Sequence, residues 1–95
     1  MIRELVLTPR FQRSFRKFVR RNPQLQRNIE QTLLNMREDV FKATLGTHKL
    51  TGDLFGLLAC SCGYDCRILF SIQQHSTTQQ EVILLLDMGT HDAIY

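Results

Sequence analysis

Apolar residues in the first half of the chain follow the spacing of two helices. Thr8 before Pro9 predicts a helix start, because a threonine side chain caps free amide groups and proline suits the first turn. One side of this helix is apolar, within about 100° on a helical wheel, and carries Phe11, Phe15, Phe18 and Val19. Asn22 before Pro23 predicts a second start, and the apolar positions that follow are Leu25, Ile29, Leu33, Met36 and Val40. Two helices so close in sequence are expected to form an antiparallel hairpin.

The second half of the chain changes to the alternation that is typical of β-strands. Residues 54–62, 66–73 and 81–88 are rich in Leu, Ile, Val, Phe and Cys, and short polar stretches separate them. Three consecutive strands with short connections predict an antiparallel meander.

The remaining segments complete the predicted order of elements. Residues 2–7 are predicted to form a short strand, residues 41–53 a loop, and residues 89–95 a tail that leaves the last strand. The order is therefore βααβββ, an α+β fold in which an N-terminal helical hairpin packs on one face of an antiparallel sheet. With 95 residues the chain is expected to form one domain, residues 1–95, because a second domain would have too few residues to bury a core.

The sequence shows no pattern of a secretory leader or of a membrane span. An acid, Glu4, stands where a leader would be basic, and no apolar run approaches the ~18 residues of a span. We therefore expect a soluble, cytoplasmic protein.

Charge is distributed unevenly along the chain, whose net charge is +3. Residues 1–50 contain eleven of the twelve Lys and Arg residues and four of the nine acids, whereas residues 51–95 contain only Arg67 and five acids. The predicted first helix has a basic side opposite its apolar one, formed by Arg10, Arg13, Arg16, Lys17, Arg20 and Arg21. Such a surface favours nucleic acid as a partner, although surface bases also serve solubility alone.

Three cysteines, Cys60, Cys62 and Cys66, lie within seven residues. Their odd count and the absence of a leader argue against a disulfide framework. Together with a histidine they would supply enough ligands for zinc, but their spacing is not that of a usual zinc site. We expect them to be small, buried strand residues, and we expect no metal or other cofactor.

Three polar residues stand out because packing does not require them. His48 is in the predicted loop next to Lys49, Arg67 is on an apolar strand, and His91 follows the last strand. If the outer strands of the meander flank the middle one, these side chains converge at one edge of the sheet. Metal-free RNA cleavage needs such groups: a base for the ribose 2′-hydroxyl, an acid for the leaving oxygen and a cation for the phosphate.

Each of these residues also has a purely structural interpretation. The two histidines can be solvated or can cap an element, and Tyr95 can simply pack its ring. Arg67 can form an ion pair with Asp65 or Asp87. The residues alone leave both interpretations open.

Residues 48–54, 64–70 and 89–95 read HKLTGDL, YDCRILF and GTHDAIY. In this order, and in a chain of this length, they resemble the RelE/ParE superfamily of bacterial toxins. The resemblance is to its RelE-like mRNA-interferase branch, which includes the YafQ-like and HigB-like toxins, and it covers essentially the whole chain.

The resemblance implies the toxin of a type II toxin–antitoxin pair. Such a toxin enters the ribosomal A site, cleaves translated mRNA there by metal-independent attack of the ribose 2′-hydroxyl, and is silenced by a cognate antitoxin. The catalytic residues that it implies are His48, Asp65, Arg67, His91 and Tyr95. The basic helix and Lys49 would then bind RNA or the ribosome.

Two departures from the family pattern affect this assignment. Some relatives carry a histidine shortly before the position of Asp65, whereas residues 60–63 here are Cys-Ser-Cys-Gly. The C-terminal helix of several relatives is also absent. Proton transfer then rests on His48 and His91, with the base and the acid not assigned. The alternatives are a ParE-like inhibitor that binds DNA gyrase and a catalytically degenerate domain that binds only antitoxin or RNA. Neither alternative requires His48, Arg67 and His91 together.

Overall fold

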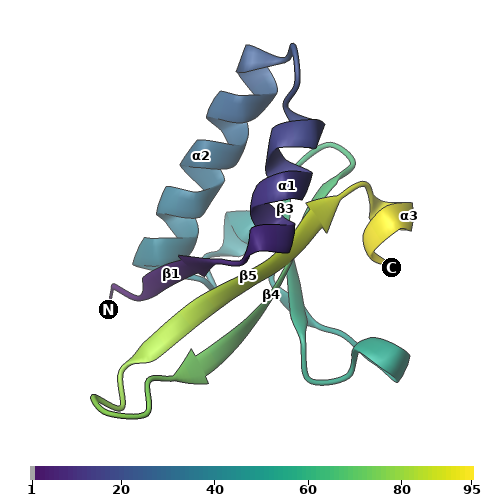
Figure 1. The fold of residues 1–95 in the computed structure, drawn as a ribbon. Helices are drawn as coiled ribbons and strands as arrows, with labels where there is room; N and C mark the ends of the chain where they lie inside the picture. Colours follow the sequence, from purple (N-terminus) through teal and green to yellow (C-terminus); the bar gives the residue numbers. More distant parts are fainter. Residues whose placement is uncertain (1) are drawn as a thin grey trace.

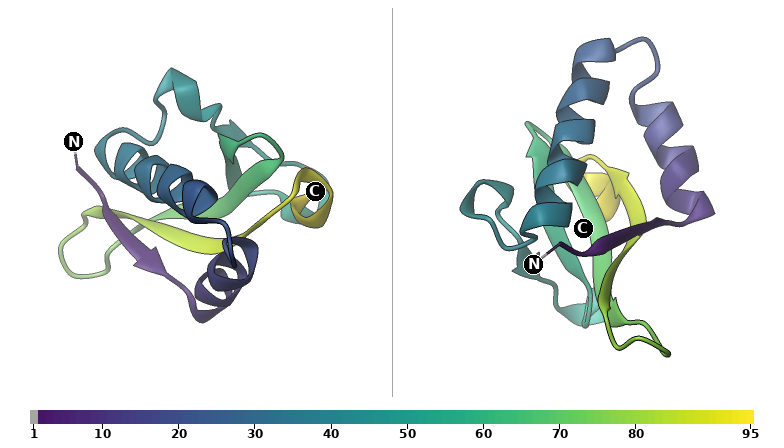
Figure 2. Two further views of the ribbon diagram at one scale, coloured as in Figure 1. Left: turned by 90° about the horizontal axis from the view of Figure 1, so that it is seen from above. Right: turned by 90° about the vertical axis from the view of Figure 1, so that its left-hand side faces the viewer.

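The computed structural model describes residues 2–95, which form two layers (Figure 1). A five-stranded sheet is one layer, and the helices α1 (Pro9–Phe18) and α2 (Pro23–Glu38) cover one of its faces (Figures 1 and 2). The predicted α+β fold, with a helical hairpin on one face of the sheet, is confirmed.

Both helices begin where the sequence predicts. The Thr8 hydroxyl accepts a hydrogen bond from the Phe11 amide (3.2 Å), and the Asn22 side chain accepts one from the Leu25 amide (3.1 Å). Each cap satisfies an amide group that has no partner within its own helix. α1 ends before its basic run does, and the connection to α2 turns at Arg21, whose φ is 58°.

The strands are β1 (Glu4–Leu7), β2 (His48–Lys49), β3 (Leu58–Gly63), β4 (Cys66–Gln74) and β5 (Glu81–Gly89), and their spatial order is β1-β5-β4-β3-β2. The antiparallel meander of β3, β4 and β5 is confirmed, with β4 in the middle. β1 pairs with β5 in parallel, with Glu4 opposite Val82. The first strand of the chain therefore lies beside the last one, a pairing that the sequence pattern did not predict.

Two segments that were expected to be irregular contain regular structure. Residues 41–53 include β2 between the short 3-10 helices Ala43–Leu45 and Gly52–Leu54. The expected tail includes α3 (His91–Ile94), a single helical turn. Both elements are too short for hydrophobic periodicity to reveal them. The predictions of a plain loop and a plain tail are therefore wrong at these two places.

The hydrophobic core lies between the sheet and the helices α1 and α2. Its largest fully buried side chains include Phe11, Ile29, Met36, Ile68 and Phe70. The apolar side predicted for the first helix faces this core, where Phe11 and Val19 are buried and Phe15 and Phe18 are partly buried.

All three cysteines are buried, as predicted, but two of them are joined. Cys62 and Cys66 form a disulfide with their Cα atoms 5.0 Å apart, and Cys60 is free. The expectation of no disulfide is wrong because the turn at residues 63–65 brings the ends of β3 and β4 to a separation that a disulfide spans. Among residues 2–95 no three or more His, Cys, Asp or Glu side chains are grouped as a metal site would need.

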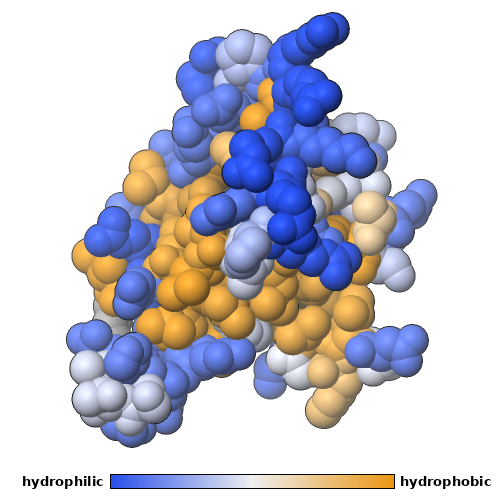
Figure 3. Space-filling model, in the orientation of Figure 1, coloured by the Kyte–Doolittle hydropathy of each residue, from blue (hydrophilic) through white to orange (hydrophobic). Residues whose placement is uncertain are grey.

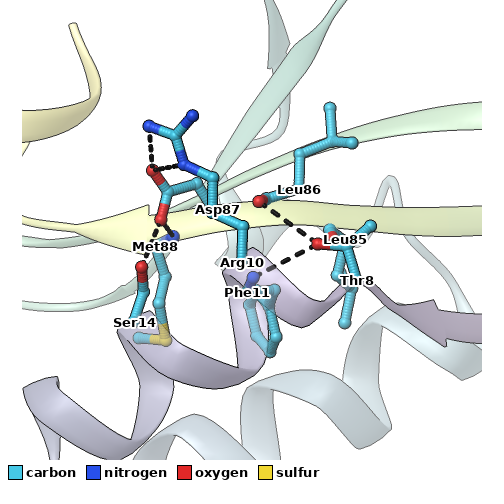
Figure 4. Close-up of polar contacts among 8 residues, drawn as sticks. All are labelled: Thr8, Arg10, Phe11, Ser14, Leu85, Leu86, Asp87 and Met88. Atoms are coloured by element: carbon cyan, nitrogen blue, oxygen red, sulfur yellow. Dashed lines mark hydrogen bonds and ion pairs between the residues drawn. The ribbon is translucent and has the colours of Figure 1, made fainter.

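β5 contains an irregularity where it passes α1 (Figure 4). Its register against β4 shifts by one residue at Leu86, and a shift of this kind re-aims the side chains beyond it. Asp87, just beyond the shift, lies opposite Leu69 and contacts α1: it accepts a hydrogen bond from Ser14 (2.6 Å) and forms an ion pair with Arg10 (3.1 Å). Thr8, at the start of α1, donates to a carbonyl oxygen of β5 (2.7 Å). These contacts fix α1 to the last strand.

The surface divides into polar and apolar areas. Figure 3 shows hydrophilic side chains over α1 and a hydrophobic area over β1 and β5. Val6 and Leu7 of β1 are 38% and 40% exposed. No helix formed by residues 2–95 has the length and apolar character needed to cross a membrane.

Candidate active site

The register of the sheet places His48 and Arg67 on the same face. His48 of β2 lies opposite Ala59 of β3, and Ala59 lies opposite Leu69 of β4. Residues opposite one another on neighbouring strands share a face, and so do residues two apart on one strand, such as Leu69 and Arg67. Ile68, which points the other way, is fully buried in the core. Arg67 and His48 therefore project from the face that α1 and α2 leave open.

One terminal nitrogen of Arg67 is fastened to the turn between β3 and β4. Nη1 donates to the carbonyl oxygens of Cys66 (2.9 Å) and Gly63 (3.2 Å) and to the hydroxyl of Ser61 (3.5 Å). These acceptors are neutral, so they hold the guanidinium in place without neutralising its charge.

α3 brings His91 and Tyr95 over this open face. Gly89 ends β5 directly opposite Arg67, and a Cβ atom added there would lie 3.3 Å from a side chain of α3. The glycine therefore lets α3 fold back closely on the end of the strand. The Tyr95 hydroxyl lies 3.2 Å from His48 Nε2, and the ring centroids of Tyr95 and His91 are 4.5 Å apart.

The phenol of Tyr95 is the group that links the other three. Burial raises the pKa of Tyr95, and the nearby charge of Arg67 partly opposes this shift. The phenol is therefore neutral at physiological pH and donates its proton to the hydrogen bond with His48.

Both imidazoles place Nδ1 next to an acceptor, but the two acceptors differ in charge. His48 Nδ1 lies 3.0 Å from the Gly46 carbonyl oxygen, which can only accept, so in the neutral ring Nδ1 carries the proton and Nε2 has a free lone pair. His91 Nδ1 lies 3.4 Å from a carboxylate oxygen of Asp92, which also accepts. His48 thus presents a lone pair to the site, whereas His91 lies beside a negative charge.

Asp65 lies at the same end of the sheet but contacts backbone. Its Oδ1 accepts a hydrogen bond from the backbone amide of His91 (2.9 Å). Within residues 2–95 neither Asp65 nor Asp87 forms an ion pair with Arg67. The interpretation of Arg67 as one half of a structural ion pair is therefore wrong.

The predicted basic surface is exposed. The residues Arg13, Arg16, Lys17, Arg20 and Arg21 are exposed, and so is Lys49, beside His48 in β2. Arg10 is exposed as well but differs in being paired with Asp87. A cavity of about 590 Å³ is lined by Arg10 and Lys17 on one side and by Thr90 on the other. The basic helix and the start of α3 therefore border one hollow.

Two groups that contact the site residues could not be predicted from the sequence. The Gly46 carbonyl, which orients His48, is a backbone group and has no residue signature. The Ser61 hydroxyl contacts Arg67 only because β3 and β4 pair in this register. His75, which was expected to be inert, accepts from the turn amide of Thr77 (3.2 Å) beyond the other end of β4.

No protein-family model matches the sequence, and no curated protein matches it. Solved structures do match, and they are toxins of toxin–antitoxin systems. The YoeB/ParE toxin from Agrobacterium tumefaciens superposes with a TM-score of 0.75 at 15% sequence identity, over 93% of this chain and 98% of that one. YafQ from E. coli strain BL21(DE3) gives a TM-score of 0.76 at 10% identity, over 98% of both chains.

A third match is the E. coli DinJ–YafQ toxin–antitoxin complex, with a TM-score of 0.74 at 11% identity, over 100% of this chain and 99% of that one. At these identities the likeness shows the fold. The chain has the fold of the toxins YoeB and YafQ over essentially its full described length.

Proposed function

We propose that this chain is the toxin of a type II toxin–antitoxin pair and an endoribonuclease that cleaves mRNA on the ribosome without a metal. The observation that carries the proposal is the convergence of His48, Arg67, His91 and Tyr95 on one open face, from three separate segments of the chain. A protein that acts only by binding has no need of this arrangement.

The hydrogen bonds of the two histidines support a division of roles. His48 Nε2 accepts the proton of the ribose 2′-hydroxyl, which takes the place of the Tyr95 hydroxyl at that nitrogen. The 2′-oxygen attacks the phosphorus, and the bond to the 5′-oxygen breaks. His91, next to Asp92, gives a proton to the leaving 5′-oxygen. The products are a 2′,3′-cyclic phosphate and a 5′-hydroxyl end.

Arg67 is the group that stabilises the phosphate during this step. Its charge is permanent and is not paired with a carboxylate of residues 2–95. A fixed cation at the point where negative charge develops contributes a large part of the rate.

The likeness to the DinJ–YafQ complex supports a partner antitoxin for this chain. The net charge of +3 and the exposed bases of α1 favour an acidic partner segment. The place of action that follows from the proposal is the translating ribosome in the cytoplasm.

Expression without an antitoxin, followed by primer extension on cellular mRNA, tests the proposal. We expect new 5′ ends inside translated codons, in frame, and the same cleavage on intact ribosomes by purified chain that has first been stripped of metal with a chelator. Arrested replication with intact mRNA would instead identify an inhibitor of the gyrase-binding kind. Growth without either effect would identify a domain that only binds.

A further inference from the structure

Asp65 occupies an unusual backbone position for its residue type. It lies in the turn between β3 and β4 with φ at 51°, in the left-handed region that favours glycine. Aspartate and asparagine tolerate this region better than other side chains do, but glycine tolerates it best. What aspartate supplies here, and glycine does not, is a hydrogen-bond acceptor.

That acceptor is used on a distant segment. Asp65 Oδ1 accepts from the backbone amide of His91 (2.9 Å), 26 residues later in the chain. His91 is the first residue of α3, and the amide of a first helical residue has no acceptor within its helix. Thr90 accepts from the Ala93 amide (3.3 Å), so the turn of helix is capped by one local and one distant side chain.

α3 depends on such contacts for its position. A helix of four residues is too short to be stable alone. Its buried anchor is Ile94, which is 7% exposed. The same turn of helix carries His91 and Tyr95, and Tyr95 reaches His48.

The carboxylate of Asp65 takes no part in the contacts among the reacting groups. Within residues 2–95 it makes no hydrogen bond or ion pair with either imidazole or with Arg67. The one hydrogen bond that joins this carboxylate to the site comes from the backbone amide of His91.

We propose that Asp65 is a positioning residue: it holds α3 in place, and with it His91 and Tyr95, and it transfers no proton. The part of this inference that concerns cleavage rests on the proposed function. The part that concerns the placement of α3 does not.

Two substitutions at this position separate the two roles. Asp65→Asn keeps an oxygen acceptor and tolerates the left-handed backbone, but cannot act as an acid or base near neutral pH. Asp65→Gly keeps the backbone conformation and removes the acceptor. A matched control is Gln79→Gly, which changes another left-handed position (φ 63°) in the turn between β4 and β5.

We expect Asp65→Asn to cleave ribosome-bound mRNA within about threefold of the unchanged protein and with the same pH profile. Asp65→Gly should be slower by about tenfold or more, because a displaced reacting group costs rate steeply. In amide hydrogen exchange measured by NMR, His91 should be protected in the unchanged protein, in Asp65→Asn and in Gln79→Gly. That protection should be lost in Asp65→Gly.

Either of two results would overturn the inference. One is an Asp65→Asn variant as slow as Asp65→Gly with the His91 amide still protected, which would make the carboxyl a proton-transfer group. The other is an Asp65→Gly variant that keeps both the protection of that amide and full cleavage. If the unchanged protein cleaves no RNA, the proposed function fails, and the exchange of the His91 amide still decides whether Asp65 holds α3.

Discussion

Arg67 stands between two fully buried residues of β4, Cys66 and Ile68, and keeps its charge at the surface of the sheet. Such a position is unfavourable for a long charged side chain unless neighbouring groups hold it. The turn carbonyls at 2.9 and 3.2 Å do so, and they leave the charge available to a phosphate.

Arg67→Ala should lower the rate of mRNA cleavage by about 100-fold or more, because it removes the cation from the transition state. Stability should fall only slightly, since the freed carbonyl oxygens can bind water. Single-turnover cleavage and urea denaturation measure the two effects. Arg27→Ala, on the exposed side of α2, is the matched control and should leave the rate unchanged. An Arg67→Ala protein that cleaves at the normal rate would remove the basis of the proposed site.

Cys60 makes stability depend on pH in the alkaline range. Burial raises the pKa of its thiol from 9.0 to about 12, and the charge of Arg67 opposes the shift. Between these values the unfolded chain loses the thiol proton while the folded chain keeps it, so stability should fall by about 1.4 kcal/mol per pH unit. Below pH 9 this group should have no effect.

The measurement is the free energy of unfolding in urea from pH 8 to 11, compared with that of Cys60→Ala. The substituted protein should start less stable and lose less stability as the pH rises. Parallel curves for the two proteins would contradict the raised pKa.

At the scale of elements, the sequence predicted those that repeat a pattern and missed those that do not. The helices were found from their Thr and Asn caps and from four and five apolar positions respectively, and the meander from its alternation. β2 and α3 have two and four residues, so no period can appear in them. Yet these two elements carry His48 and His91, so the candidate residues and their convergence were predicted, while the short elements that hold them were not.

The irregularity in β5 shows a second limit. Ile83 and Leu85 are buried two residues apart, but the next buried side chain is Met88, because the register shifts at Leu86. A pattern of period two cannot anticipate an inserted residue. Asp87, which the sequence left as a possible partner of Arg67, lies just beyond this shift and pairs with Arg10 of α1 instead.

The turn between β3 and β4 gives a prediction about the disulfide. Reducing Cys62–Cys66 should lower stability by about 2 kcal/mol, since the bond closes a short loop, and should leave cleavage in place. The hydrogen bonds of Arg67 involve backbone carbonyls of the paired strands and do not need the sulfur atoms. Urea denaturation and cleavage assays with and without a dithiol reductant, and with Cys62→Ala/Cys66→Ala, check this. If the reduced protein is still fully folded but no longer cleaves mRNA, the prediction is wrong.

At the scale of the whole molecule, charge divides the protein between a basic helix and a largely neutral sheet. The exposed bases of α1 lie opposite the side that packs on the core, so they can change without disturbing it. A surface that neutralises phosphates releases counterions, and its binding weakens steeply with salt.

Arg13→Glu/Lys17→Glu/Arg20→Glu should therefore weaken binding to ribosomes and flatten its salt dependence, with the thermal midpoint little changed. The matched control is Arg27→Glu/Arg37→Glu/Lys42→Glu, which changes the net charge equally at exposed positions outside the basic run of residues 10–21. Sedimentation with ribosomes at several salt concentrations measures both. Equal losses for the two triple variants would mean that net charge, and not the surface of α1, governs binding.

The pairing of β1 with β5 has a consequence for how the protein is made. β1 leaves the ribosome before the other four strands, but its partner strand β5, with Val82 opposite Glu4, is the last of the five to be synthesised. The sheet cannot close until that strand has emerged, and contacts between such distant segments form late in folding. α3 follows β5, so a nascent chain holds His48 and Arg67 before it has His91 or Tyr95. A nascent chain on the ribosome therefore has an incomplete site until α3 and Tyr95 have emerged and can fold.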